Sequence, residues 1–112
     1  MRLKGKVALV TGAATGVKGE LMGFGGATSW LFSREGARVV LTDINEELGE
    51  RSAADICASG GEAIFVKLDV TREEDWKEAI QSTVSKYGRL DVLVNNVGWT
   101  IDRLFMEKPR EE

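Results

Sequence analysis

Glycine residues crowd one short stretch of the chain, directly after an apolar run that is typical of a buried strand. Six of the 13 glycines lie between positions 12 and 26. Glycine lets a backbone turn tightly and approach a ligand closely. A helix that begins after such a turn offers unpaired N–H groups to a phosphate. The order of strand, glycine-rich loop and helix therefore predicts a loop that binds nucleotide phosphates, although an ordinary strand-to-helix turn is the alternative. The candidate cofactor-binding residues are Gly12, Thr15 and Gly16 in the first part of the loop and Gly25 near its end.

An acidic residue, Asp43, follows the second apolar run of the chain. A carboxylate at the end of that strand can bond both ribose hydroxyls of an adenosine. It would also repel a 2′-phosphate, so it favours NAD over NADP, while the nearby cations Lys18, Arg34 and Arg38 work in the opposite direction. The alternative is that Asp43 caps the next helix, but Asn45 can do this alone. We therefore favour the ribose-binding role.

Two further polar groups follow later apolar runs. Asp69 and Val70 come after the third run, and Asn95, Asn96 and Gly98 come after the fourth. The carboxyl ends of parallel strands share the sheet edge at which ligands bind, so these residues are candidate cofactor contacts. The alternatives are that Asp69 only satisfies loop N–H groups and that the asparagines only form a turn.

Composition excludes several classes of function. The chain of 112 residues has a net charge of −3 and no histidine, which speaks against a nucleic-acid or anionic-membrane partner. Cys57 is the only cysteine, so we expect neither an internal disulfide nor a metal site. No apolar run approaches membrane-spanning length, and the amino-terminal residues do not resemble a signal peptide. We therefore expect a cytoplasmic protein with no membrane partner.

The elements that must position these residues alternate between strands and helices. Strands are expected at 6–11, 38–42, 63–68 and 90–94. Helices are expected over 27–32, over 45–59 and from a cap at Thr71 to Tyr87. Glycines at positions 36, 60 and 88 mark helix ends. Thr71 and Glu74 read as a capping box for the last helix. Trp30 and Trp76 are expected in the core.

This alternation predicts an α/β fold, a Rossmann-like doubly wound parallel sheet of about four strands in the order 3-2-1-4. The fourth strand would then be left as an exposed apolar edge. We therefore expect residues 1–98 to form a partial dinucleotide-binding domain. Residues 99–112, a charged tail with Pro109, would lead into a missing carboxyl-terminal half. The isolated chain is expected to self-associate, or to take up a complementing fragment, through that strand.

Four motifs in this order resemble the short-chain dehydrogenase/reductase family. They are KVALVTGAATG at 6–16, GARVVLTD at 36–43, LDVT at 68–71 and DVLVNNVG at 91–98. The tail from Asn96 resembles the 3-oxoacyl-carrier-protein-reductase-like branch. The resemblance implies a loop at Gly12 that holds a pyrophosphate, an NAD-selecting Asp43, an adenine contact at Asp69 and Val70, and an asparagine turn that supports sheet and cofactor.

The chain departs from this family pattern in two places. The catalytic serine and the Tyr-x-x-x-Lys motif of the family have no counterpart here, since Tyr87 is the only tyrosine and no lysine stands four residues after it. In the loop, Lys18 stands where the third glycine is expected, and Gly25 resumes the pattern about seven residues late. Positions 12 and 43 are 31 residues apart, against roughly 20 in the fingerprint. The extra residues should cost only about 1 kcal/mol or less in loop closure but should weaken NAD binding.

Three functions follow as hypotheses. The first is the NAD(P)-binding portion of a short-chain dehydrogenase/reductase. Such an enzyme transfers hydride between a nicotinamide cofactor and an alcohol or carbonyl substrate. This chain alone is then expected to be inactive, with no catalytic residue of its own. The second is a non-catalytic nucleotide-binding or interaction module that completes its sheet with a partner. The third, another Rossmann enzyme such as a methyltransferase, is disfavoured by the asparagine turn.

Overall fold

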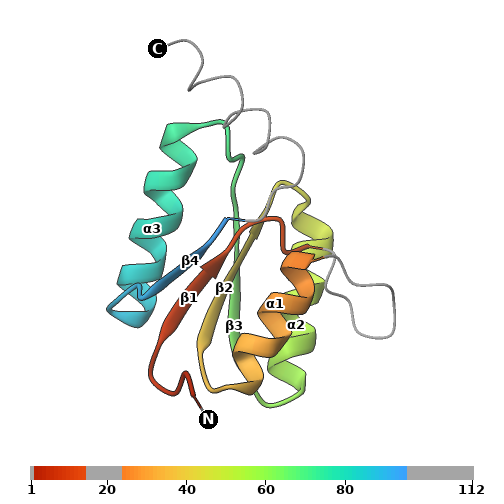
Figure 1. The fold of residues 1–112 in the computed structure, drawn as a ribbon. Coiled ribbons are helices and arrows are strands. Elements are labelled where there is room, and N and C mark those ends of the chain that lie inside the picture. The colour runs from red at the N-terminus through yellow and green to blue at the C-terminus, as the bar shows by residue number, and fades with distance from the viewer. Residues whose placement is uncertain (1, 15–23, 96–112) are drawn as a thin grey trace, which may run out of the picture.

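A computed structural model describes residues 2–14 and 24–95, which form a four-stranded sheet with helices on both faces (Figure 1). Figure 1 shows α1 and α2 on one face of the sheet and α3 on the other. The strands are β1 (Val7–Val10), β2 (Arg38–Asp43), β3 (Glu62–Lys67) and β4 (Val92–Val94), and the helices are α1 (Phe24–Arg34), α2 (Glu46–Ala58) and α3 (Glu73–Tyr87).

All the strand pairs are parallel, and the order is β3-β2-β1-β4. The predicted fold class is therefore confirmed. Leu9 of β1 lies opposite Val40 of β2 on one side and Leu93 of β4 on the other. The four residues of β1 have no exposed surface, because the strand is central and helices cover both of its faces. This is why its sequence is uninterrupted by polar residues.

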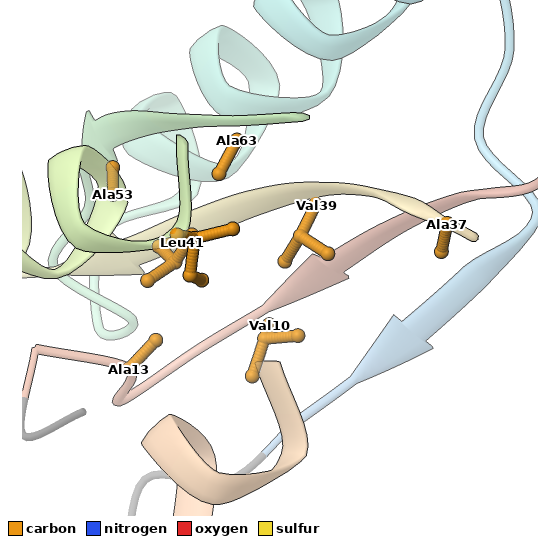
Figure 2. Close-up of a cluster of buried hydrophobic side chains, with 8 residues drawn as sticks. Val10, Ala13, Ala37, Val39, Leu41, Ala53 and Ala63 are labelled. Carbon is orange, nitrogen blue, oxygen red and sulfur yellow. The ribbon is translucent and has the colours of Figure 1, made fainter. Parts of the chain in front are cut away.

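Each face of the sheet carries its own apolar core. On the side of α1 and α2, small and branched aliphatic side chains pack between the sheet and α2 (Figure 2). On the side of α3, Leu9 and Val40 pack with Leu68 and Ala79. Trp30 packs against the first core and Trp76 against the second, as predicted. The first core consists of Val10, Ala13, Ala37, Val39, Leu41, Ala53, Ile56 and Ala63.

Local signals place several helix ends correctly. Asn45 is the N-cap of α2, and its side chain accepts a hydrogen bond from the N–H of Leu48 at 3.1 Å. Gly88 ends α3 in the left-handed conformation, with φ of 84°, which glycine adopts without the steric cost that a Cβ brings. The helix α1 begins at Phe24, earlier than the apolar segment that predicted it.

The predicted capping box at Thr71 is wrong. The N-cap of α3 is Arg72, and no side chain caps the helix there. The hydroxyl of Thr71 instead donates to Oδ1 of Asp69 at 2.6 Å. A hydrogen bond to an ionised carboxylate is a strong one, so this bond holds the Thr71 side chain in the turn before the helix, one residue ahead of the N-cap position.

Within the described residues, β4 pairs only with β1 and is shorter than predicted. Asp91, expected inside the strand, precedes it: its N–H donates to the carbonyl of Val7, and its Oδ2 accepts from the N–H of Val7 at 2.9 Å. The side chain of Leu93 is 50% exposed, so β4 is an apolar edge in this part of the chain. No helix among the described residues has both the length and the apolarity needed to cross a bilayer.

Candidate functional site

A cavity of about 270 Å³ opens at the carboxyl edge of the sheet. It is bounded by the segments that follow β1, β2 and β3, which meet there because these strands are parallel. The structure thus brings four of the predicted site residues together. The lining residues are Gly12, Asp43, Ile44, Leu68, Asp69, Val70 and Thr71.

The beginning of the glycine loop packs tightly against the beginning of α1. Gly12 has a φ of 62°, in the left-handed region that favours glycine. A Cβ atom on Gly25 would lie 2.9 Å from both the carbonyl carbon of Gly12 and the carbonyl oxygen of Thr11, and closer still to the carbonyl oxygen of Gly12. The first turn of α1 therefore contacts the backbone at the end of β1 without an intervening side chain. Of the predicted loop residues, Thr15 and Gly16 lie outside the described residues.

Three hydrogen bonds fix the residues that follow Gly12. The N–H of Ala13 donates to the carbonyl of Thr42 at 3.1 Å, and the N–H of Ala14 donates to Oδ2 of Asp43 at 3.1 Å. The buried hydroxyl of Ser52, in α2, donates to the carbonyl of Ala14 at 3.2 Å. The start of the loop is thus anchored to β2 and α2.

Asp43 lies half-buried at the end of β2, beside the cavity. Its Oδ2 accepts from Ala14, and its Oδ1 accepts from the N–H of Asn45 at 3.0 Å. Since Asn45 caps α2 by itself, Asp43 is not the N-cap of that helix. A carboxylate has about four acceptor positions, so these two backbone bonds orient the group and leave capacity for a ligand.

Asp69 lies at the start of the turn between β3 and α3. Its Oδ1 accepts from both the hydroxyl and the N–H of Thr71, at 2.6 and 3.0 Å. These two bonds, with a smaller effect of Arg72, hold the pKa of the Asp69 carboxyl below its usual value. Asp69 is therefore an anion at neutral pH. It satisfies loop groups, as the structural alternative predicts, and it also lines the cavity.

Two residues of α3 that sequence reasoning did not assign to the site hold this turn in place. Oδ2 of Asp75 accepts from the N–H of Asp69 at 2.9 Å. The indole N–H of Trp76 donates to the carbonyl of Val70 at 2.9 Å. The only sequence signal was the place of both residues in the first turn of the helix that follows Asp69 and Val70.

Asn95 lies on the other side of β1. Its Oδ1 accepts from the hydroxyl of the buried Thr11 at 3.1 Å, and the N–H of Thr11 donates to the carbonyl of Val94. Asn95 therefore ties the end of β4 to the beginning of the glycine loop and is not among the described residues that line the cavity. Asn96 and Gly98 fall outside the described residues.

Tyr87 lies near the amino-terminal ends of the strands, whereas the cavity lies at their carboxyl-terminal ends. The guanidinium of Arg38, at the start of β2, is 5.7 Å from the centre of its ring, whereas the cavity is at the end of β2. Among residues 2–14 and 24–95, no cluster of three or more acidic, cysteine or histidine side chains could hold a metal ion. The chemistry offered by the described cavity is therefore recognition by backbone groups, two carboxylates and apolar walls.

Comparison with known proteins gives one consistent result. The model of the short chain dehydrogenase family matches residues 6–112. The chain is 44% identical, over 97 residues, to the 2,5-dichloro-2,5-cyclohexadiene-1,4-diol dehydrogenase LinX of Sphingobium indicum, covering 87% of the chain and 36% of that protein. It is 41% identical to the 3-oxoacyl-[acyl-carrier-protein] reductase FabG of Thermotoga maritima, over its whole length and 43% of that protein.

Solved structures agree with the sequence comparison. A hydroxysteroid dehydrogenase from Escherichia coli superposes with a TM-score of 0.77 at 35% identity, covering 87% of this chain and 38% of that one. The chain spans less than half of the length of these relatives.

Proposed function

The chain belongs to the short-chain dehydrogenase family, and we propose that its cavity binds the adenosine half of a nicotinamide cofactor. A protein that carries this domain would then be an oxidoreductase that acts on an alcohol or carbonyl group. The cofactor, when bound, accepts or donates the hydride. The described residues bind and orient it. The observation that carries this proposal is the meeting of Gly12, Asp43, Asp69 and Val70 around one cavity.

The residues present fit such a ligand in three respects. Where the loop meets α1, Gly25 and Gly12 bring their backbones together with no side chain between them. A pyrophosphate site needs such bare backbone, because its oxygens bind to N–H groups at the start of a helix. Oriented by two backbone N–H groups, the carboxylate of Asp43 can accept bonds from ribose hydroxyls. Ile44, 63% exposed in a polar turn, and Val70 offer apolar walls to a purine.

The same carboxylate favours NAD over NADP as the cofactor. A 2′-phosphate would place negative charge beside Asp43, and the ribose hydroxyl it replaces could no longer donate. Thr15, Gly16, Asn96 and Gly98 remain proposed contacts from the family pattern. Residues 1–98 are proposed as a partial dinucleotide-binding domain, with 99–112 leading out of it. We place no catalytic residue in the described part, because Tyr87 lies at the opposite edge of the sheet.

Calorimetry with NAD and NADP tests this proposal. We expect NAD to bind at least about tenfold more tightly than NADP, which corresponds to about 1.4 kcal/mol. Asp43→Ala should abolish that preference, whereas Glu50→Gln, which removes a negative charge from an exposed position of α2, should not change it. Absence of NAD binding by the chain and by a version lacking residues 18–24 would overturn the proposal. Tighter binding by the shortened version would support the expected effect of the long loop.

A second proposal concerns association through β4. Leu93 of this edge strand is 50% exposed, and Ile80 and Val84 of α3 are 39% and 44% exposed. Leu93 lies opposite Leu9, whose side chain belongs to the core on the α3 side, so the three residues belong to the same face. We propose that the isolated chain pairs with a second copy along this edge. Sedimentation should show association that weakens in Leu93→Lys, and a monomer at high concentration would contradict this.

A further inference from the structure

We propose that Asp75 and Trp76 are positioning residues for the purine end of the cavity. They hold the backbone of Asp69 and Val70, the two residues at which an adenine is expected. This inference rests on the proposed function, since it concerns how that cavity selects its base. It assigns to the first turn of α3 a role beyond packing.

Two hydrogen bonds connect α3 to the turn. Asp75 accepts from the N–H of Asp69, and Trp76 donates to the carbonyl of Val70, both at 2.9 Å and both across six residues. The turn is also tied to the sheet, because the N–H of Leu68 donates to the carbonyl of Asp43 at 3.0 Å. Consecutive residues of α3 thus fix consecutive residues of the turn.

The bond from Trp76 also orients the Asp69 side chain. The carbonyl of Val70 and the N–H of Thr71 belong to one peptide group, which is planar and rigid. Its carbonyl end is held by Trp76, and its N–H end donates to Oδ1 of Asp69 at 3.0 Å. A rotation of this peptide would therefore move both bonds together. Trp76 acts on the Asp69 carboxylate through a single rigid plane.

The orientation of that carboxylate bears on which purine is accepted. With Oδ1 engaged by Thr71, Oδ2 is the atom that the turn leaves for a ligand. Asp69 is an acceptor only, because its carboxyl is ionised at neutral pH. Adenine offers an amino donor at C6, whereas hypoxanthine carries a carbonyl there. A fixed acceptor therefore favours adenine, and a mobile one discriminates less.

Substitutions can separate this role from packing. Trp76 is half-buried and packs against the core under α3. Trp76→Phe keeps an aromatic ring there and removes the indole N–H donor together with part of the ring system, so the readout is the discrimination between nucleotides and not stability. Asp75→Ala removes the acceptor, while Asp75→Asn retains an acceptor oxygen and should restore the bond. Glu78→Gln, at an exposed position of α3, is the control for a change of charge on the same helix.

The experiment measures the affinities of the chain for AMP and for IMP by calorimetry. We expect the wild type to bind AMP more tightly than IMP. Trp76→Phe and Asp75→Ala should lower the ratio of the AMP affinity to the IMP affinity by about fivefold, the equivalent of one hydrogen bond. Asp75→Asn and Glu78→Gln should retain the ratio. An equal loss of affinity for both nucleotides, with the ratio unchanged, would show a structural role only and overturn the inference. A wild type that binds neither nucleotide would overturn the proposed function and the inference with it.

A ligand-free measurement keeps the inference testable if one variant folds poorly. Amide hydrogen exchange at Thr71 reports the bond to Asp69 directly. Exchange there should be faster in Trp76→Phe than in the wild type, with protection elsewhere in α3 unchanged. Equal protection of Thr71 in both proteins would overturn the coupling between Trp76 and Asp69.

Discussion

Gly25, in the first turn of α1, lies directly against the carbonyl group of Gly12 at the end of β1. A methyl group at Gly25 would overlap backbone atoms of Gly12 and Thr11, and backbone cannot move aside as the tip of a flexible side chain can. The contact joins glycines at the two ends of a loop that has about seven more residues than the family motif. It therefore shows where the strand and the helix meet, independently of the loop between them.

Gly25→Ala should destabilise the chain because the added methyl group forces α1 away from β1. We expect the free energy of unfolding to fall by about 1–3 kcal/mol, as for other overpacked sites, measured by urea denaturation. Ala27→Ser adds one atom to an exposed residue of the same helix and should change it by less than about 0.5 kcal/mol. Equal stability of Gly25→Ala and wild type would contradict the close approach.

Ser52→Ala tests the anchor of the glycine loop on α2. Loss of the buried hydroxyl leaves the carbonyl of Ala14 without that donor, which should cost about 1–3 kcal/mol. The matched control is Ser59→Ala, since the hydroxyl of Ser59 donates to the carbonyl of Ile56 at an exposed position. Urea denaturation should rank the two variants clearly, and a larger loss at Ser59 would be evidence against the anchor.

Asp91 should make the free energy of unfolding of the chain depend on pH in the acidic range. The bond from Arg89, followed by that from the N–H of Val7, lowers the pKa of the Asp91 carboxyl from its ordinary value of 3.8. Its contribution is therefore present above pH 3.8 and lost as the pH falls through the lowered pKa. Asp91→Asn cannot ionise, so its deficit in urea midpoint should be greatest at neutral pH and shrink towards about pH 2. A deficit that is independent of pH would refute this assignment.

Tyr87 should ionise at unusually high pH. Burial, and then the negative charges of Glu62 and Cys57, raise the pKa of its phenol above 10.0, while Arg38 opposes them. Because Tyr87 is the only tyrosine, an ultraviolet absorbance titration reports it alone. We expect Glu62→Gln to lower this pKa and urea-unfolded chain to titrate near its ordinary value of about 10. The neutral phenol contributes stability that is lost as the pH rises above 10.0. A native pKa equal to that of the unfolded chain would contradict the burial.

Much of the fold could be predicted because its causes are local or periodic. An uninterrupted apolar strand at 7–10, alternation with helices and glycines at helix ends predict a parallel sheet, and the order of strands follows from the resemblance to doubly wound folds. Asn45 caps α2 as predicted, since a cap depends on residues within one turn. The sheet edge at which Asp43 and Asp69 lie follows from the parallel arrangement alone.

What the sequence by itself determined is therefore which residues end their strands at the same edge of the sheet. Only the tertiary structure decided which backbone groups side chains of other segments hold: the N–H of Ala14 is held by Asp43, and the carbonyl of Val70 is held by Trp76. The failed capping box at Thr71 has a local cause instead, because the hydroxyl of Thr71 donates to Asp69 two residues earlier and Arg72 takes the N-cap position. Periodicity and propensity describe each segment separately, whereas the pairings of Asp43 with Ala14 and of Trp76 with Val70 depend on distances between segments, which exist only once the chain has folded.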